Sequence, residues 1–86
     1  MTAPLRVLLE DLHVFLPETF LSQSASIGED VIHVNDQEGF GEGDFIVIEP
    51  NTDVEEYNTI IDLGSLILKN KLKYNHARLA SVKRVK

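Results

Sequence analysis

The sequence predicts a mainly β fold, a small barrel or sandwich of five or six strands preceded by an N-terminal helix or extended arm. Two observations predict it. Between residues 29 and 86, short runs of β-branched and aromatic residues alternate with turns rich in Gly, Asn and Asp. Before them, apolar residues recur at helical spacing. The 86 residues suffice for one domain at most. We expect residues 1–27 to form the N-terminal helix or arm and a linker, and residues 28–86 to form the small β domain.

The N-terminal segment carries a stripe of large apolar residues that ends before Pro17, which would stop a helix. Val7 and Val14 also fit a strand, so an extended arm stays open. Either form is too apolar to remain in water, so we expect the stripe to pack on the domain or on another subunit. These candidate partner-binding residues are Leu5, Leu8, Leu9, Leu12, Phe15 and Leu16.

Residues 18–28 are short, polar and end in glycine, which predicts a linker. Five strands are then expected. The apolar run 45–48 predicts a strand buried on both faces. Residues 66–74 alternate, with Leu66, Leu68, Leu72 and Tyr74 on one face. The other face would carry a basic, partner-facing stripe of Lys69, Lys71 and Lys73. The expected strands cover 30–34, 45–49, 56–61, 66–74 and 80–85.

Size and charge both favour a protein that completes its stability against a partner. So small a domain has a modest core, and without cysteine it has neither disulfides nor Cys-based zinc sites. All 14 acidic residues lie at or before Asp62, whereas only one of the eight basic residues does. The fold could intermix these charges, or it could present two faces of opposite charge to neighbouring subunits. The net charge of −6 argues against nucleic acid as the main partner.

The patterns that carry chemistry are missing. The three histidines, His13, His33 and His76, lie in different elements without metal-ligand spacing. The Gly- and acid-rich residues 36–44 match neither a dinucleotide fingerprint nor an EF-hand. No serine stands in a nucleophile motif. We therefore expect a non-enzymatic protein with no catalytic, metal or cofactor site. The chain also lacks a secretory signal or an apolar run of membrane-spanning length, so we expect no membrane association.

From Gly28 to Val85 the order of short motifs resembles a small β module of tailed-bacteriophage virion structural proteins. Where that pattern often has glycine shortly after a His-Ala pair, this chain has Arg78-Leu79-Ala80. The matching pieces are Val31-Ile32-His33-Val34, the run from Gly39-Phe40-Gly41-Glu42-Gly43-Asp44 through Ile48, Glu56-Tyr57-Asn58-Thr59-Ile60, Leu66-Ile67-Leu68, Tyr74-Asn75-His76-Ala77 and Val82-Lys83-Arg84-Val85.

Within this stretch we assign five fold-defining residues. Gly39 and Gly43 flank Phe40, whose ring would plug one end of the barrel, and Asp44 would cap the turn. His76 is expected to be a hydrogen-bonded packing residue rather than a ligand.

The resemblance, together with the small size and the apolar N-terminus, implies a structural virion protein assembled in the host cytoplasm. A capsid decoration or cement protein that stabilises neighbouring shell subunits is the leading interpretation. A neck, tail or baseplate protein is the alternative within the virion, and a free cytoplasmic protein-binding module is the alternative outside it. The expected partners are the major capsid protein or neck and tail subunits, with a homo-oligomer as the expected state.

Overall fold

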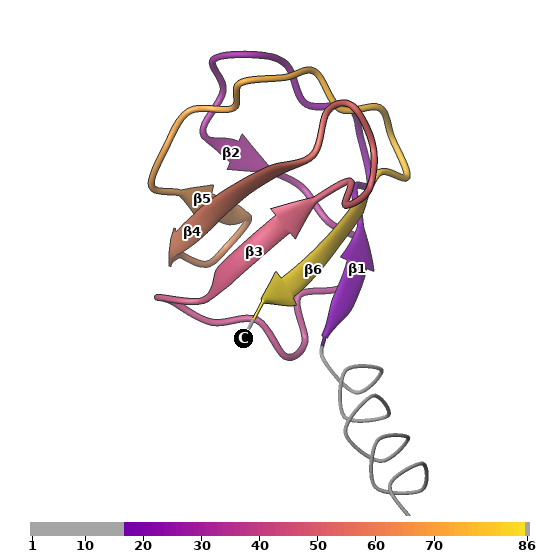
Figure 1. Ribbon diagram of the computed structural model, residues 1–86. Coiled ribbons are helices and arrows are strands. Elements are labelled where there is room, and N and C mark those ends of the chain that lie inside the picture. Colours follow the sequence, from indigo (N-terminus) through magenta and orange to yellow (C-terminus); the bar gives the residue numbers. More distant parts are fainter. Residues whose placement is uncertain (1–16, 86) are drawn as a thin grey trace, which may run out of the picture.

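The computed structural model describes residues 17–85, and all regular structure within them is β (Figure 1). The prediction of a mainly β fold is confirmed. The helix or arm expected before Pro17 lies outside the described residues. The strands are β1 (Glu18–Phe20), β2 (Val31–Ile32), β3 (Phe45–Ile48), β4 (Glu56–Asp62), β5 (Leu66–Leu68) and β6 (Ser81–Val85).

The six strands form one antiparallel sheet in the order β1-β6-β3-β4-β5-β2. Strand twist curls this sheet around a single core. At one end the two outermost strands meet, because the Ser22 N–H donates to the His33 carbonyl at 2.8 Å and the Asn35 N–H donates to the Phe20 carbonyl at 3.0 Å. The architecture is therefore a half-barrel whose edges join at one end, rather than a sandwich.

The segment predicted as a linker belongs to the β domain. Its first residues form β1, which pairs with β6, and Leu21 and Ala25 are buried in the core. Ala25 and His76 also exchange backbone hydrogen bonds, both of 2.8 Å. The prediction was wrong here because a strand of three residues leaves almost no local pattern, and its partner lies about sixty residues further along the chain. The sheet of the β domain therefore includes residues 18–20, which precede the expected boundary at Gly28.

The core lies inside the curl and draws on residues spread along the described chain. In β3, Ile46 and Ile48 point inward, while Val47 on the other face is only 6% exposed, so burial on both faces is confirmed for these three residues. Phe45, at the start of the strand, is exposed instead. The core consists of Leu21, Ala25, Ile32, Phe40, Ile46, Ile48, Ile60, Leu66, Leu68, Leu72, Ala80 and Val82.

Strand β5 ends at Leu68, whereas the alternation predicted a strand through Tyr74. Where the strand ends, a side chain of β4 makes the hydrogen bonds to the backbone that a neighbouring strand would otherwise make. The buried Asn58 amide donates to the Asn70 carbonyl at 2.8 Å, and its oxygen accepts from the Asn70 N–H at 3.0 Å. These two bonds satisfy the Asn70 backbone without a neighbouring strand, which allows the chain to leave the sheet.

The side chain of Glu56 also binds the backbone of this irregular segment, a few residues after Asn70. Its buried carboxylate accepts hydrogen bonds from the N–H groups of Lys73, at 2.9 Å, and Tyr74, at 3.1 Å. The alternation of burial still holds at Leu72, which lies in the core, but Tyr74 is exposed. Two polar side chains that point inward from β4 therefore hold an irregular segment against the barrel.

The loop before β3 depends on glycine at one position. Gly39 has a φ of 90°, and a Cβ there would lie 2.7 Å from Cγ of Pro17. Only glycine adopts this backbone conformation easily and leaves room for the proline ring. The next residue, Phe40, is buried in the core. Close contact at Gly39 thus fixes the loop that inserts Phe40.

Asp44 closes the second turn of this loop. Its Oδ2 accepts from the Gly41 N–H at 2.7 Å, and its own N–H donates to the Gly41 carbonyl at 3.1 Å. Gly43, between them, has a φ of 88°. The turn therefore combines the side-chain cap expected of Asp44 with a left-handed glycine, and it leads the chain into β3.

Leu79 adopts a left-handed backbone, with φ 78°, in the turn before β6, where the resemblance expects a nearby glycine. A branched residue in this conformation costs about 1–2 kcal/mol, and its side chain is 57% exposed, so burial returns little. We predict that Leu79→Gly raises the free energy of unfolding by about 0.5–1 kcal/mol, measured by urea denaturation. Leu63→Gly is the control and should lower it, because Leu63 is exposed but not left-handed. If both variants lower the free energy of unfolding by the same amount, the backbone at Leu79 is not strained.

Candidate functional site

The apolar stripe predicted to bind a partner lies outside the described residues, so its contacts are not part of the site described below. The stripe nevertheless ends directly before Pro17, whose carbonyl accepts a hydrogen bond from the Arg84 N–H at 3.0 Å. The chain therefore enters the sheet next to the last residues of β6.

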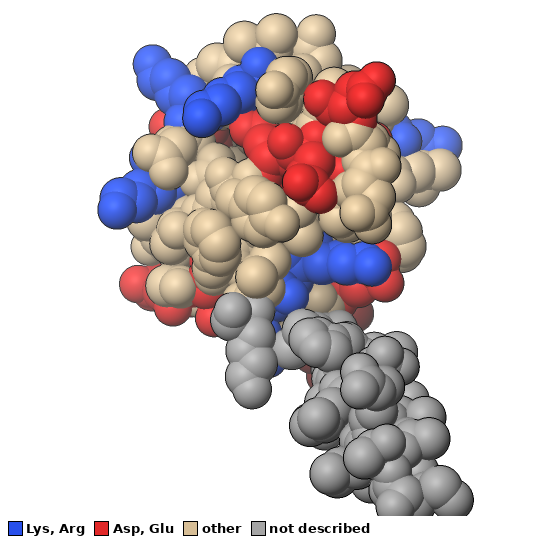
Figure 2. Space-filling view, in the orientation of Figure 1, with Lys and Arg blue, Asp and Glu red and all other residues tan. Residues whose placement is uncertain are grey.

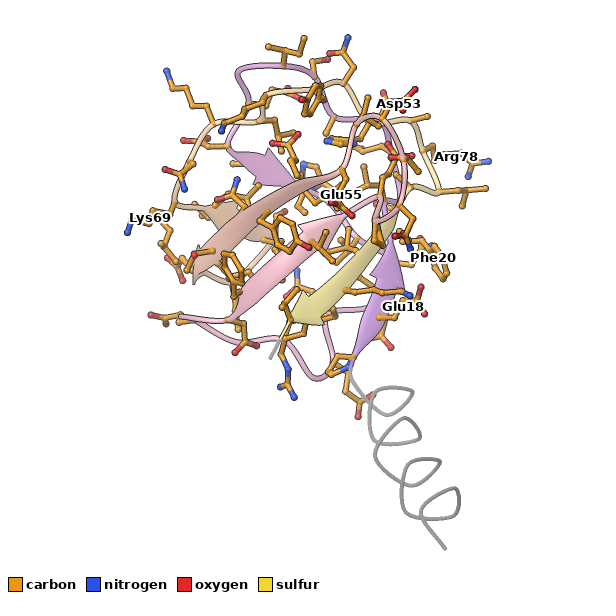
Figure 3. The ribbon with its side chains drawn as sticks, viewed as in Figure 1. Glu18, Phe20, Asp53, Glu55, Lys69 and Arg78 are labelled. Atoms are coloured by element: carbon orange, nitrogen blue, oxygen red, sulfur yellow. The ribbon has the colours of Figure 1, made fainter. Side chains whose placement is uncertain are left out.

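The predicted basic residues Lys69, Lys71 and Lys73 are all exposed. They follow β5 in the irregular segment rather than in a strand, so they do not form a straight stripe on a sheet face. Figure 3 shows Lys69 on the opposite side of the domain from Glu18. Among residues 17–85, no acidic group lies within salt-bridge distance of these three lysines.

The two charge classes are intermixed on the described surface. β6, which carries Lys83 and Arg84, lies between β1 and β3, and Lys83 Nζ is 3.9 Å from Glu18 Oε2. Both side chains of this ion pair are largely solvent-exposed, so it contributes little to stability. Figure 2 shows acidic and basic groups in separate small clusters on one face. Antiparallel pairing of late strands with early ones thus favours intermixing over two opposite poles.

An apolar area lies on the outside of the sheet, and we call it the outer face: Phe45, Val47, Tyr57, Thr59 and Val85. These residues lie opposite one another in register, Thr59 and Val85 on either side of Phe45, and Tyr57 beside Val47. The rings of Phe45 and Tyr57 stack with centroids 5.4 Å apart. They remain 45% and 51% exposed. Figure 2 shows uncharged surface over β3 and β4, bordered by charged groups.

His76 is enclosed between two carboxylates. Its Nδ1 lies 2.8 Å from Glu49 Oε2, its Nε2 lies 2.6 Å from Glu56 Oε2, and its side chain has no exposed surface. Neutral imidazole has one N–H, so a ring that donates on both sides is the imidazolium, or one carboxyl holds the shared proton. Both ring nitrogens are occupied, so this histidine has no free atom for a substrate or a metal. The expectation of a hydrogen-bonded packing residue agrees with this geometry.

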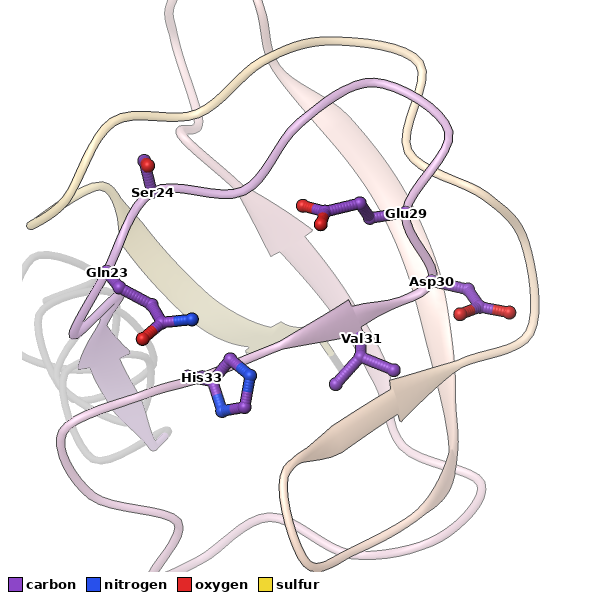
Figure 4. Close-up of a pocket in the computed structure, with 6 residues that line it drawn as sticks. All are labelled: Gln23, Ser24, Glu29, Asp30, Val31 and His33. Atoms are coloured by element: carbon purple, nitrogen blue, oxygen red, sulfur yellow. The ribbon is translucent and has the colours of Figure 1, made fainter.

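A pocket of about 200 Å³ opens where the two edges of the sheet diverge (Figure 4). It is lined by Gln23, Ser24, Glu29, Asp30, Val31 and His33. Glu29 Oε1 already accepts from the Ser26 N–H at 2.6 Å, and His33 Nδ1 is 2.9 Å from Ser65 Oγ. Pockets for small ligands usually have about 300–1,000 Å³ and apolar walls. This pocket is smaller, and two of its six lining residues already have hydrogen-bond partners.

No group of three or more His, Cys, Asp or Glu residues among positions 17–85 has the geometry to bind a metal ion. The same residues include no helix of the length and apolarity needed to cross a membrane.

Sequence reasoning missed Glu56 and Asn58 as structural groups, and it missed the outer face. A signal for the first two was present, because Glu56 and Asn58 share the inward parity of Ile60 in the same strand. Polar residues at inward positions of a strand indicate buried hydrogen bonds. The outer face had no such signal, because it depends on which strands lie side by side.

Comparison with known proteins gives one informative likeness. No family model matches the chain, and no curated protein matches it. Among solved structures it is similar to the Gp54 tailspike of Acinetobacter baumannii bacteriophage AP22, solved in complex with a capsular saccharide of A. baumannii, with a TM-score of 0.61 and 14% sequence identity. The likeness shows a shared fold. It covers 81% of this chain but only 14% of the tailspike chain.

Proposed function

We propose that this chain is a structural, non-enzymatic virion protein of a tailed phage. The observation that carries the proposal is the fold, which matches part of a phage tailspike over 81% of this chain. The order of motifs from Gly28 to Val85 led to the same class of protein from the sequence. The motif order and the backbone thus support the same class of protein.

Within the virion we favour the tail apparatus over the capsid surface. Capsid decoration was the leading interpretation of the sequence, and its support is the small size and the apolar N-terminus. The tailspike likeness supports the other alternative, a neck, tail or baseplate protein. Because this chain spans only 14% of the tailspike chain, the proposal concerns a structural module and not the saccharide binding of the tailspike.

The described site supports the non-enzymatic part of the proposal. His76 and Glu56 bond to each other and are buried away from solvent. The pocket between the sheet edges is small and lined by polar groups, two of which already have hydrogen-bond partners. The outer face, by contrast, is suited to protein contact, because exposed aromatic rings are favourable anchors at interfaces.

Purified virions provide the test. We expect mass spectrometry with isotope-labelled peptides to find the chain in particles, in far fewer copies than the major capsid protein, and cryo-EM to locate it in the tail. A copy number comparable with that of the shell subunits would replace the tail assignment with capsid decoration. If the chain occurs only in infected cells and never in particles, the proposal fails and a cytoplasmic binding module takes its place.

A further inference from the structure

We propose that one proton, held between His76 and two carboxylates, closes the loop between β3 and β4, and that losing this proton to solvent opens the loop. The two carboxylates belong to Glu49 and Glu56, and we call the three side chains the His76 cluster. The loop consists of residues 49–55 (Figure 1). The inference is independent of the position in the virion, because it depends only on contacts within the described domain.

The two hydrogen bonds of His76 need one proton more than a neutral ring carries. Nδ1 lies 2.8 Å from Glu49 Oε2, and Nε2 lies 2.6 Å from Glu56 Oε2. Each contact needs a proton between its two atoms, but a neutral imidazole with two carboxylates supplies only one. When the second proton leaves, one ring nitrogen turns a lone pair toward a carboxylate oxygen, and that hydrogen bond is lost.

Burial decides which of the two contacts breaks. The Glu56 side chain is 5% exposed, and it also accepts from the N–H groups of Lys73 and Tyr74. The Glu49 side chain is 24% exposed, and within residues 17–85 its carboxylate has no hydrogen bond other than the one to His76. A carboxylate that can turn toward water loses less on separation than one that cannot. The remaining ring proton therefore stays on Nε2, and Glu49 is the group that leaves.

The charged groups that face the ring are these two carboxylates. The segment 21–25, which pairs with His76 through the backbone of Ala25, contains only uncharged residues. Lys73 and Arg78, on the same segment as His76, are exposed. Arg84 of β6 donates to the Gly39 carbonyl at 3.2 Å instead. The proton in the cluster is therefore held by Glu49 and Glu56.

The loop has few other contacts that keep it closed. Only two hydrogen bonds join residues 49–55 to the rest of the described domain, the one from His76 and the one from the Glu49 N–H to the Ser81 carbonyl at 2.9 Å. Glu49 and Asn51 are also left-handed, with φ of 51° and 66°, a conformation that side chains other than glycine rarely adopt. Release of the Glu49 carboxylate thus removes one of two attachments from a strained loop.

NMR of the full-length chain labelled with ¹⁵N is the first test. The ring nitrogens of His76 report the loss of the proton as the pH is raised from about 5. Amide hydrogen exchange, corrected for its intrinsic dependence on pH, reports the opening of the loop. We expect protection of the Glu49 N–H to fall about tenfold over the pH range in which the ring signals change. The Ile60 N–H, which donates to the Asp44 carbonyl at 2.9 Å, is the control and should keep its protection. A ring that changes while the loop does not, or a ring that keeps one protonation state throughout the folded range, overturns the proposal.

The second test uses Glu49→Gln, which removes the need for the additional proton. The glutamine amide can donate to a neutral Nδ1 while Nε2–H donates to Glu56, so both contacts persist with a neutral ring. We expect the loop of this variant to stay closed at the pH at which the natural chain opens. Asp53→Asn is the matched control, because it removes one charge from an exposed residue of the same loop, and its loop should open as in the natural chain. If Glu49→Gln opens over the same pH range as the natural chain, the proton does not close the loop.

Discussion

Replacing His76 with alanine should remove about 3–5 kcal/mol from the free energy of unfolding, because it takes the middle group out of a buried hydrogen-bond network and leaves a cavity in its place. His76 donates to or shares a proton with Glu49 and Glu56, and its side chain is fully buried. After the substitution, the buried Glu56 carboxylate keeps two backbone donors but loses its closest partner, at 2.6 Å. Urea denaturation of the full-length chain measures the loss, which is comparable with the whole stability of many small domains.

His33→Ala is the matched control for this prediction. His33 is exposed, and its one side-chain hydrogen bond among the described residues is the 2.9 Å bond to Ser65. We expect its removal to change the free energy of unfolding by no more than about 0.5 kcal/mol. If both histidine variants unfold at the same urea concentration, the network around His76 does not stabilise the domain.

The same network predicts an effect at Glu56. Three donors converge on its carboxylate, the N–H groups of Lys73 and Tyr74 and the ring of His76. Glu56→Gln keeps the shape but places an amide NH₂ against at least one of these donors, and we expect a loss of about 1–3 kcal/mol. The same variant of the neighbouring Glu55, whose Oε1 accepts from the exposed Asn51 N–H at 2.8 Å, should cost less. Comparable urea midpoints for the two variants would contradict this ranking.

The sequence predicted the elements whose cause is local. The run from Phe45 to Ile48 is β-branched and apolar enough to indicate a strand by itself, and glycines mark the loop before it. The strand β1 could not be predicted in this way. Its three residues become a strand because β6, about sixty residues away, pairs with them. Short edge strands depend on such distant partners, so a local pattern does not reveal them.

The turns and the outer face show the same difference between features that have a local cause and features that depend on distant residues. Glycine at position 39 marked a turn in the sequence, but leucine at position 79 gave no sign that it would adopt φ 78°. The only signal was the missing glycine of the resemblance. The outer face is similar, because Phe45 and Tyr57 were each placed in a strand, whereas their stacking depends on the register between β3 and β4. A candidate site made of side chains from several strands therefore could not be predicted from the sequence, because the pairing of the strands was not known.

Two phenylalanines, one in the core and one on the outer face, allow the contributions of these two regions to stability to be measured separately. Phe40 is 7% exposed and packs in the core, whereas Phe45 starts β3 with its ring on the outside. We expect Phe40→Ala to lower the free energy of unfolding by about 3–5 kcal/mol, since it leaves a cavity in the core, next to the loop that the close contact of Gly39 with Pro17 fixes. Phe45→Ala loses only part of a stacked ring pair, which corresponds to about 0.5–1.5 kcal/mol in the isolated domain.

Urea denaturation at several protein concentrations distinguishes these two effects. The loss at Phe40 should be independent of concentration, because it arises within one copy. The loss at Phe45 should grow with concentration if the outer face is covered by a second copy, because the natural chain then gains stability by association and the variant does not. A concentration-independent difference at Phe45, equal in size to that at Phe40, would mean that Phe45 belongs to the core of a single molecule and that the outer face is not an interface.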